Sequence, residues 1–438
     1  MHVSTPHSLT GSNDGKGKPL FPAGNLVPFI LVTALFFIWG MSNNLTDILV
    51  QQFRKSFELS WIQAQLVQTA TFLGYFVMAM PAALLMRRWG YKAGILTGLV
   101  LFGAGTLMFW PAAVIGQYAP FLVALFMVGC GSSFLETAAN PFIAQFGDPA
   151  TSEKRLNFSQ AFNPPGTITG VIIGGSFIFS GIELSAGRVA EMKQAGTYAA
   201  YLHTEIMRVV PTYVGLGLAV LALAAVIFAT TFPAIQSEHE GASGNHGSFA
   251  ALIHYPHLLF AVVTQFFYVG AQVATWSNLI PYMKQYTMVT EKEAAQVLTA
   301  TLVILAVGRV VSTWLMRFFS PSRMMAIYAV VNVALLAVGV LHPGIAGATA
   351  IAATSFFMSI MFPTIFALGV KGLGPNTKMG GSLIVMSIVG GALFPPLVGL
   401  VAKHTGSLAL GYLLPLVAYV VVAAYGLLGT KLASAQAA

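Results

Sequence analysis

Two acidic residues lie inside stretches of sequence that are otherwise apolar. Asp47 is near the end of the apolar stretch 27–51, in NNLTDILV, and Glu136 is in the middle of the stretch 119–145, in GCGSSFLETAANPF. An ionisable side chain in the centre of a bilayer costs at least about 3 kcal/mol, so such residues are functional candidates by default. We therefore predict a function for both carboxylates. Two structural alternatives are an exposed position at a helix end for Asp47 and an interhelical hydrogen bond for Glu136.

Arg309, in VGRVVSTW, is the one basic residue well inside an apolar stretch. It has two equally supported interpretations, a functional group or a residue that joins helices together.

Helical spacing places each acidic residue beside other polar or aromatic side chains. Residues three or four positions apart share one face of a helix. Four such faces are formed by Trp39, Asn43 and Asp47, by Ser132, Glu136 and Asn140, by Gln160 and Asn163, and by Gln265, Tyr268, Gln272 and Trp276. Polar faces on four helices fit poorly against lipid, and we expect them to surround a shared, water-filled cavity.

The chemistry of these faces favours an uncharged ligand with many hydroxyl groups. Asn and Gln side chains offer donors and acceptors together, which suits vicinal hydroxyls. Trp and Tyr offer flat surfaces for the C–H side of a sugar ring. A cationic ligand would favour acidic residues with aromatic residues and few amides, and a carboxylate ligand would favour a central Arg or Lys. The set predicts a site for a neutral sugar.

The elements that carry these residues are predicted to be membrane-spanning helices. The 438 residues are 56% hydrophobic and 8% charged, whereas a soluble domain is usually about one-quarter charged. A spanning helix needs about 20 mostly apolar residues. Twelve windows qualify: 27–51, 62–86, 93–114, 119–145, 156–180, 211–232, 257–283, 294–317, 323–341, 346–371, 380–402 and 409–432. The chain is predicted to be an all-α membrane protein with twelve transmembrane helices.

Charge distribution predicts the orientation. Residues 1–24 are polar, carry Lys16 and Lys18, and lack the apolar core of a signal peptide. If the chain crosses the membrane twelve times, twelve of the 21 Lys and Arg residues lie on the same side as the N-terminus and eight lie on the opposite side. The remaining one, Arg309, lies inside a span. Basic residues favour the cytoplasmic side, so we expect both termini in the cytoplasm. Because these residues are spread over loops, nucleic acid is not an expected partner.

Cys130 is the only cysteine, which excludes an intramolecular disulfide and a cysteine metal cluster. We expect no cofactor and no bound metal.

The chain is predicted to consist of two related halves. FFIWG begins at Phe36 and FFYVG at Phe266, while LMRRWGYK begins at Leu85 and LMRFFSPSR at Leu315. Both pairs have the same spacing of 230 residues, which indicates a parallel internal repeat. We predict a polar N-terminus (1–24), a six-helix bundle (25–232), a cytoplasmic linker rich in Gly, Ser and His (233–256), and a second six-helix bundle (257–438). This plan is similar to that of the major facilitator superfamily, whose substrate site lies between the halves. A monomer is sufficient for such a site.

Three proline motifs are predicted to interrupt helices. They are NPPG (163–166), FPT (362–364) and GGALFPP (390–396). Proline removes a backbone donor and kinks a helix. Such sites are either bending points for alternating access or packing kinks.

Longer stretches resemble one family within that superfamily. FFIWGMSNNLTDILVQQF, LETAANPF, RLNFSQAFN, YVGAQVATWSNLI and GSLIVMSIVGG are similar to the fucose–galactose–glucose:proton symporters, over about residues 25–430. The resemblance implies proton-coupled sugar import across the inner membrane of a bacterium. It implies proton coupling and sugar recognition by Asp47 and Glu136. It places these residues at the cavity: Trp39, Asn43, Gln160, Asn163, Gln272 and Trp276.

The choice of sugar is less closely determined by the resemblance. NNLTDIL and VGAQVATWSNLI resemble the fucose branch, so L-fucose or a related sugar is expected. That branch has Gln-Tyr where this chain has Met361-Phe362, which makes Phe362 an apolar part of the predicted wall. We add Tyr268 and Phe362 to the predicted sugar ligands. Glucose, galactose and N-acetylglucosamine are the alternative substrates.

Three other classes of protein are possible alternatives to a sugar symporter. A drug:proton antiporter would use the same intramembrane acids. A non-transporting sugar sensor would share the fold. An intramembrane aspartyl protease needs two aspartates inside spans, and Asp47 alone is available, so we do not expect an enzyme.

Overall fold

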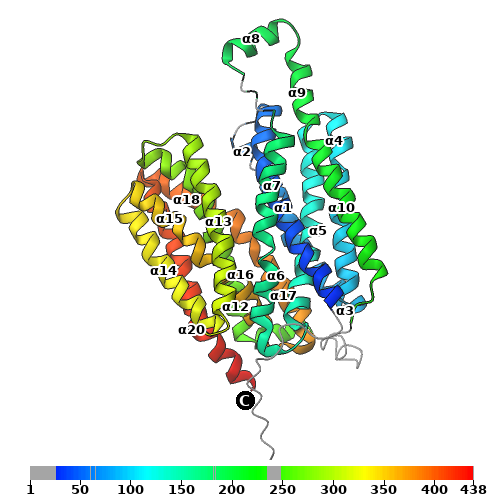
Figure 1. The fold of residues 1–438 in the computed structure, drawn as a ribbon, viewed down its shortest axis with the longest axis vertical. Coiled ribbons are helices and arrows are strands. Elements are labelled where there is room, and N and C mark those ends of the chain that lie inside the picture. Colours follow the sequence, from blue (N-terminus) through cyan, green and yellow to red (C-terminus); the bar gives the residue numbers. More distant parts are fainter. Residues whose placement is uncertain are drawn as a thin grey trace, which may run out of the picture.

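The structure is a computed structural model that describes residues 26–59, 61–64, 66–180, 182, 184–233 and 248–437. The predicted N-terminal segment 1–24 and most of the predicted linker 233–256 lie outside these residues. Throughout the described ranges the secondary structure is helical, as predicted (Figure 1).

Among the described residues, the first half contains ten α-helices. They are α1 (Leu26–Ser56), α2 (Trp61–Ala64), α3 (Leu66–Leu107), α4 (Phe109–Ile115), α5 (Tyr118–Gln145), α6 (Ser152–Gln160), α7 (Asn163–Ile173), α8 (Ala186–Gln194), α9 (Tyr198–Met207) and α10 (Val209–Ala229).

The second half begins after a short 3-10 turn at Ala250–His254. Its helices are α12 (Pro256–Tyr286), α13 (Glu291–Leu315), α14 (Pro321–Leu341), α15 (Ile345–Met358), α16 (Met361–Val370), α17 (Thr377–Met386), α18 (Gly390–Thr405), α19 (Leu408–Gly411) and α20 (Leu413–Ala437).

These helices account for the twelve predicted spans. Ten continuous helical stretches in the described part of the chain are long and apolar enough to cross a membrane. One of them, Leu66–Ile115, is 50 residues long and holds two predicted spans, because Gly90 (φ 79°) turns the chain between them. The remaining span, 156–180, is built from the shorter helices α6 and α7.

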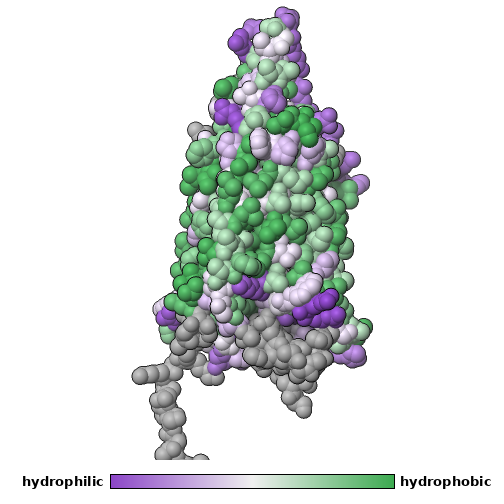
Figure 2. Space-filling view, turned by 90° about the vertical axis from the view of Figure 1, so that its right-hand side faces the viewer, coloured by the Kyte–Doolittle hydropathy of each residue, from purple (hydrophilic) through white to green (hydrophobic). Residues whose placement is uncertain are grey.

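The surface carries a broad apolar belt. Figure 2 shows, on one face of the molecule, hydrophobic residues across the middle and hydrophilic residues toward both ends. Many large apolar side chains are exposed among the described residues, for example Val100, Ile172 and Val310. A soluble monomer rarely exposes a continuous apolar patch of such extent, so the belt fits contact with lipid.

Glycine contacts show the internal repeat in three dimensions. A Cβ at Gly40 in α1 would lie 2.1 Å from the carbonyl oxygen of Asn163 in α7. In the other half, a Cβ at Gly390 in α18 would lie 2.1 Å from the carbonyl oxygen of Phe266 in α12. In each half, the first membrane span (α1 or α12) therefore packs against the fifth span (α7 or α18) so closely that only glycine fits.

The regular α-helix is interrupted just before each of the three predicted proline motifs. Short turns separate α6 from α7, directly before Asn163, and α15 from α16, whose second residue begins the FPT motif. The 3-10 turn Ser387–Val389 directly precedes Gly390, where the third motif begins. The residues that directly precede α7 and α16 keep right-handed helical dihedral angles, and Pro395 and Pro396 lie inside α18.

The two halves are joined by polar contacts toward the end of the molecule where the C-terminus lies (Figure 1). Lys371 forms an ion pair with Glu153 at 3.0 Å, and the Asn157 amide donates to the Thr364 hydroxyl at 3.2 Å. The Lys378 ammonium donates to the carbonyl of Met86 at 2.9 Å. The opposite end carries α2, α8 and α9 in the same view.

Candidate functional site

Glu136 lies in the middle of α5 with 1% of its surface exposed. Neither of its carboxylate oxygens has a hydrogen-bond partner among the described residues, and the same is true of the Trp39 indole N–H, the Tyr75 hydroxyl and the Asn140 Nδ2. Buried polar groups are normally paired, and leaving one unpaired costs about 1–3 kcal/mol. These donors and acceptors are therefore free to pair with water or with a bound polar ligand.

Two amides continue this cluster toward the break in the fifth span. Gln160 donates from Nε2 to Asn140 Oδ1 at 2.9 Å. Asn163 instead donates to the backbone carbonyl of Phe36 at 3.3 Å. The two amides thus donate to neighbours on two different helices, α5 and α1, and their predicted common face stays a prediction.

Asp47 is held at a different place on α1. Its Oδ1 accepts a hydrogen bond from the side-chain amide of Gln68 in α3. The side chain is exposed, but α1 continues past it to Ser56. Asp47 is thus well inside the helix, and the alternative that placed it at a helix end is wrong, although the side chain can reach water.

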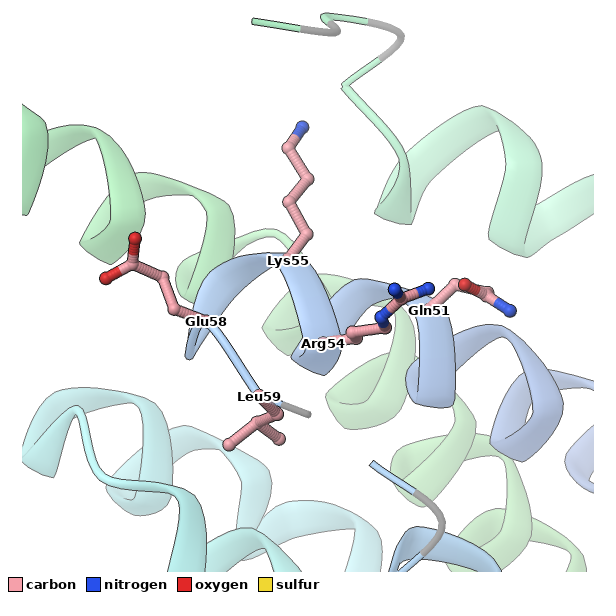
Figure 3. A pocket seen from close by; sticks show the side chains of 5 residues that line it. All are labelled: Gln51, Arg54, Lys55, Glu58 and Leu59. Carbon is pink, nitrogen blue, oxygen red and sulfur yellow. The ribbon is translucent and has the colours of Figure 1, made fainter. Parts of the chain in front are cut away.

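The exposed face of α1 continues from Asp47 to a hollow at the helix end. Asn43, Asp47, Gln51 and Arg54 follow a 4-4-3 spacing along α1 and are exposed, as is Glu58 beyond the end of the helix. Gln51, Arg54 and Glu58 line an open hollow of about 430 Å³ together with Lys55 and Leu59. Figure 3 shows these side chains around the last turns of α1. The hollow lies at the C-terminal end of α1, beyond Asp47, which does not line it.

The second half contributes mostly aromatic side chains. Phe362 lies edge-to-face with Trp39 at a centroid distance of 6.3 Å, so the two predicted residues meet across the halves. Trp276 donates from Nε1 to the Ser355 hydroxyl at 3.2 Å. Gln272 is half-buried, whereas Gln265 is fully buried, with no partner for its amide among the described residues.

Tyr268 differs from the prediction in what its hydroxyl does. The residue is 0% exposed, and its hydroxyl donates to the carbonyl of Met358 at 2.9 Å. The hydroxyl is therefore occupied by a backbone carbonyl at the end of α15, in the tenth span.

Arg309 joins helices, as one of its two interpretations predicted. Its guanidinium donates to the carbonyl of Ser359 at 2.6 Å and to the carbonyl of Gln160 at 2.8 Å. Both carbonyls stand at helix breaks, one in each half. A charged donor at these positions satisfies backbone groups that the broken helices leave unpaired.

Sequence reasoning missed Gln68 and Tyr75. Both lie on α3, on a face that also includes Thr71, with spacings of three and four residues. The spacing is the same signal that identified the other faces, but this second span contains no charged residue to draw attention to it. In the described part of the chain, no group of three His, Cys, Asp or Glu residues could hold a metal ion.

Comparison with known proteins identifies the family. The model of the Major Facilitator Superfamily matches residues 30–395. The chain belongs to the Major Facilitator Superfamily. It is thus a multi-pass membrane transporter and not an enzyme, and the predicted twelve-helix fold is confirmed.

Several members of the superfamily are similar over most of their length. The chain is 41% identical to the L-fucose-proton symporter of Escherichia coli K12, over 91% of this chain and 92% of that one. It is 35% identical to the glucose/galactose transporter of Brucella abortus, over 91% and 93%. These matches confirm the resemblance to the fucose–galactose–glucose group within the superfamily.

Solved structures agree in fold. A crystal structure of the transporter FucP in the outward conformation matches with a TM-score of 0.85 and 40% identity, over 92% of this chain and 99% of that one. The proton:xylose symporter XylE matches with a TM-score of 0.64 and 14% identity, over 92% and 95%, which shows the shared superfamily fold alone.

Proposed function

We propose that this transporter is a proton-coupled sugar symporter and that it imports a neutral monosaccharide, L-fucose or a closely related sugar. The observation that carries this proposal is the set of unpaired polar atoms around Glu136, on α1, α3 and α5. The names of the relatives support it, because both the fucose and the glucose/galactose proteins transport sugars.

The first half supplies the polar side of the sugar site. Glu136 and Asn140 Nδ2 offer an acceptor and a donor, and the Trp39 indole offers a donor and a flat face. Such a set can pair with vicinal hydroxyls on one edge of a sugar ring. Asn43 and Gln160 extend this side, and Asn163 and Gln272 complete the proposed ligands.

The second half supplies the apolar side. Phe362 and Trp276 belong to it, and Phe362 contacts Trp39 directly. A 6-deoxy sugar lacks the hydroxyl at C6 and therefore presents a methyl group to such a wall. Hydrophobic pockets distinguish a methyl from a hydroxymethyl group only weakly, so galactose is a natural competitor.

Proton coupling is assigned to the two carboxylates. Asp47 has the better route to water, through the exposed face of α1. Glu136 is in the dry interior beside the proposed sugar ligands. Asp47 therefore acts mainly in proton exchange, and Glu136 acts in both sugar recognition and coupling.

Alternating access follows from the position of the contacts between the halves. The Glu153–Lys371 and Asn157–Thr364 contacts close the end near the C-terminus. Sugar and proton would enter from the end that carries Asp47, after which these contacts break. With both termini in the cytoplasm of a bacterium, this direction is import, and one monomer is sufficient.

The experiment is transport by purified protein in liposomes with an imposed pH gradient, acid outside. Labelled L-fucose should accumulate, and unlabelled L-fucose should compete better than glucose or N-acetylglucosamine. Accumulation of a lipophilic cation outside the liposomes would favour the drug:proton antiporter instead. Binding of sugar without any flux would favour the sensor.

A further inference from the structure

Lys371, which forms the ion pair between the halves, makes a second contact within its own half. Its ammonium reaches Glu153 of the first half at 3.0 Å. Its backbone carbonyl lies 3.0 Å from Nε2 of His257, the second residue of α12. A carbonyl oxygen only accepts hydrogen bonds, so His257 Nε2 carries a proton and donates it. Lys371 therefore connects the start of α12 to α6 of the other half.

The backbone around Lys371 has few constraints of its own. Lys371 is the first residue beyond α16, and its backbone is extended (φ −65°, ψ 130°). Gly372 (φ 74°) and Gly374 (φ 51°) follow in left-handed conformations. Glycine has the widest choice of backbone conformations, so the position of this loop depends on contacts that other elements make with it.

The segment that leads into α12 makes those contacts. His257 is buried, with 2% of its surface exposed, so its ring is held by packing. The Tyr255 hydroxyl accepts a hydrogen bond from the Asn376 amide at 3.4 Å, and Asn376 Oδ1 accepts one from the backbone N–H of Ser248 at 2.8 Å. The same segment therefore fastens both ends of the loop 371–376.

The ion pair depends on this support because Lys371 is partly in solvent. Its side chain is 43% exposed, whereas that of Glu153 is 7% exposed. Ion pairs of exposed side chains contribute little, since ordering a long side chain costs conformational entropy. A backbone that is already fixed removes part of this cost. The group that holds the Lys371 backbone therefore strengthens the contact between the halves.

We propose that His257 is a positioning residue for this contact. By donating to the Lys371 carbonyl, it keeps the ammonium within reach of Glu153 and so favours the conformation that is closed at the end near the C-terminus. This inference rests on the proposed function in taking the Glu153–Lys371 contact to be one that breaks during transport.

The test compares two variants of His257. His257→Phe keeps a flat ring but has no donor, whereas His257→Gln places an amide donor near the position of Nε2. In a Cys130→Ser, Thr364→Cys background, the single thiol lies at a buried position between the halves. Its rate of alkylation by a water-soluble maleimide, without sugar, measures how often this end opens. His257→Phe should raise the rate about two- to tenfold, the range for a lost hydrogen bond, and His257→Gln should stay near the background rate.

Two controls separate positioning from a general loosening of the protein. In a background that also contains Lys371→Met, His257→Phe should not change the rate further, because it acts through the Lys371 ammonium. Tyr282→Phe is the matched control. It removes another buried donor of α12, which bonds to the backbone carbonyl of Gly339 near the opposite end of the helix, and it should leave the rate unchanged.

An unchanged rate in His257→Phe overturns the proposal, and so does an equal increase in the Lys371→Met background. If His257→Phe does not fold, His257→Asn replaces it, because its shorter amide cannot reach the Lys371 carbonyl. An unchanged rate in His257→Asn overturns the proposal in the same way. Because the assay uses no sugar, a faster rate in a protein that transports no sugar would remove the proposed function and leave this inference standing. Sugar transport with unchanged rates would do the reverse.

Discussion

The side-chain amide of Gln68 donates a hydrogen bond to the carboxylate of Asp47. This contact ties the acidic residue of α1 to α3, within the same half of the molecule. The position of the Asp47 side chain is therefore set within this half and does not depend on the contact between the halves.

Replacement of Gln68 by leucine should impair proton-coupled accumulation more than sugar binding. Without the amide donor, the Asp47 carboxylate loses its hydrogen-bond partner on α3, so accumulation of L-fucose driven by a pH gradient should fall about five- to tenfold. L-fucose affinity, measured by calorimetry, should remain near that of the wild type. Gln296→Leu is the control, because Gln296 is exposed on α13 in the other half. Wild-type accumulation in Gln68→Leu would show that the hydrogen bond has no part in coupling.

The amides of Asn43 and Gln272 are predicted to bind sugar directly. They lie three and two residues after the repeat-related glycines Gly40 and Gly270, one in each half. Asn43→Ala and Gln272→Ala should each weaken sugar binding by about 1–3 kcal/mol, the usual cost of a lost hydrogen bond that leaves its partner unpaired. Calorimetry with L-fucose measures this. Wild-type affinity in both variants would exclude the two residues as ligands.

Phe362 is predicted to influence which sugar is preferred. Its ring packs edge-to-face on Trp39, so Phe362→Tyr adds a hydroxyl to the apolar wall with little change in shape. The variant should gain relative affinity for galactose over L-fucose, by a factor of about ten at most, since pockets of this kind discriminate weakly. Competition against labelled L-fucose in liposomes gives the ratio. A ratio equal to that of the wild type would place Phe362 away from the C6 position of the sugar.

The contact between Asn157 and Thr364 should have to open in every transport cycle. The two side chains meet at 3.2 Å between the halves. In a Cys130→Ser background, which removes the single native cysteine, Asn157→Cys with Thr364→Cys can be joined by a short, reductant-cleavable thiol crosslinker. The linked protein should lose sugar exchange, and reductant should restore it. Either single-cysteine variant treated in the same way is the control, and exchange by the linked protein would contradict alternating access at this contact.

Periodicity in the sequence predicted which residues share a face of one helix, but it did not predict the contacts that these residues make with neighbouring helices. The twelve spans, the repeat of 230 residues and the faces around Asp47 and Glu136 follow from spacing alone. Tyr268 lies on the predicted face of α12, but its hydroxyl is taken by the carbonyl of Met358, the last residue of α15. Spacing gives no information on such a partner in another helix.

The same limit explains the two missed residues. Gln68 and Tyr75 are ordinary residues in an uncharged span, and they matter only because α3 packs against both α1 and α5. Gln160 and Asn163 lie on either side of the turn between α6 and α7, and their spacing gave no indication that one amide would contact α5 and the other α1.

The central claim is that a carboxylate of this site couples proton movement to sugar movement, and Asp47→Asn tests it most directly. Asparagine keeps the shape of the protonated acid but cannot release a proton. The variant and the wild type should be compared in the same liposomes by sugar counterflow and by uptake driven by a pH gradient. We predict that Asp47→Asn retains counterflow but neither accumulates L-fucose nor responds to external pH. Uphill, pH-dependent accumulation by Asp47→Asn at the wild-type level would contradict the account.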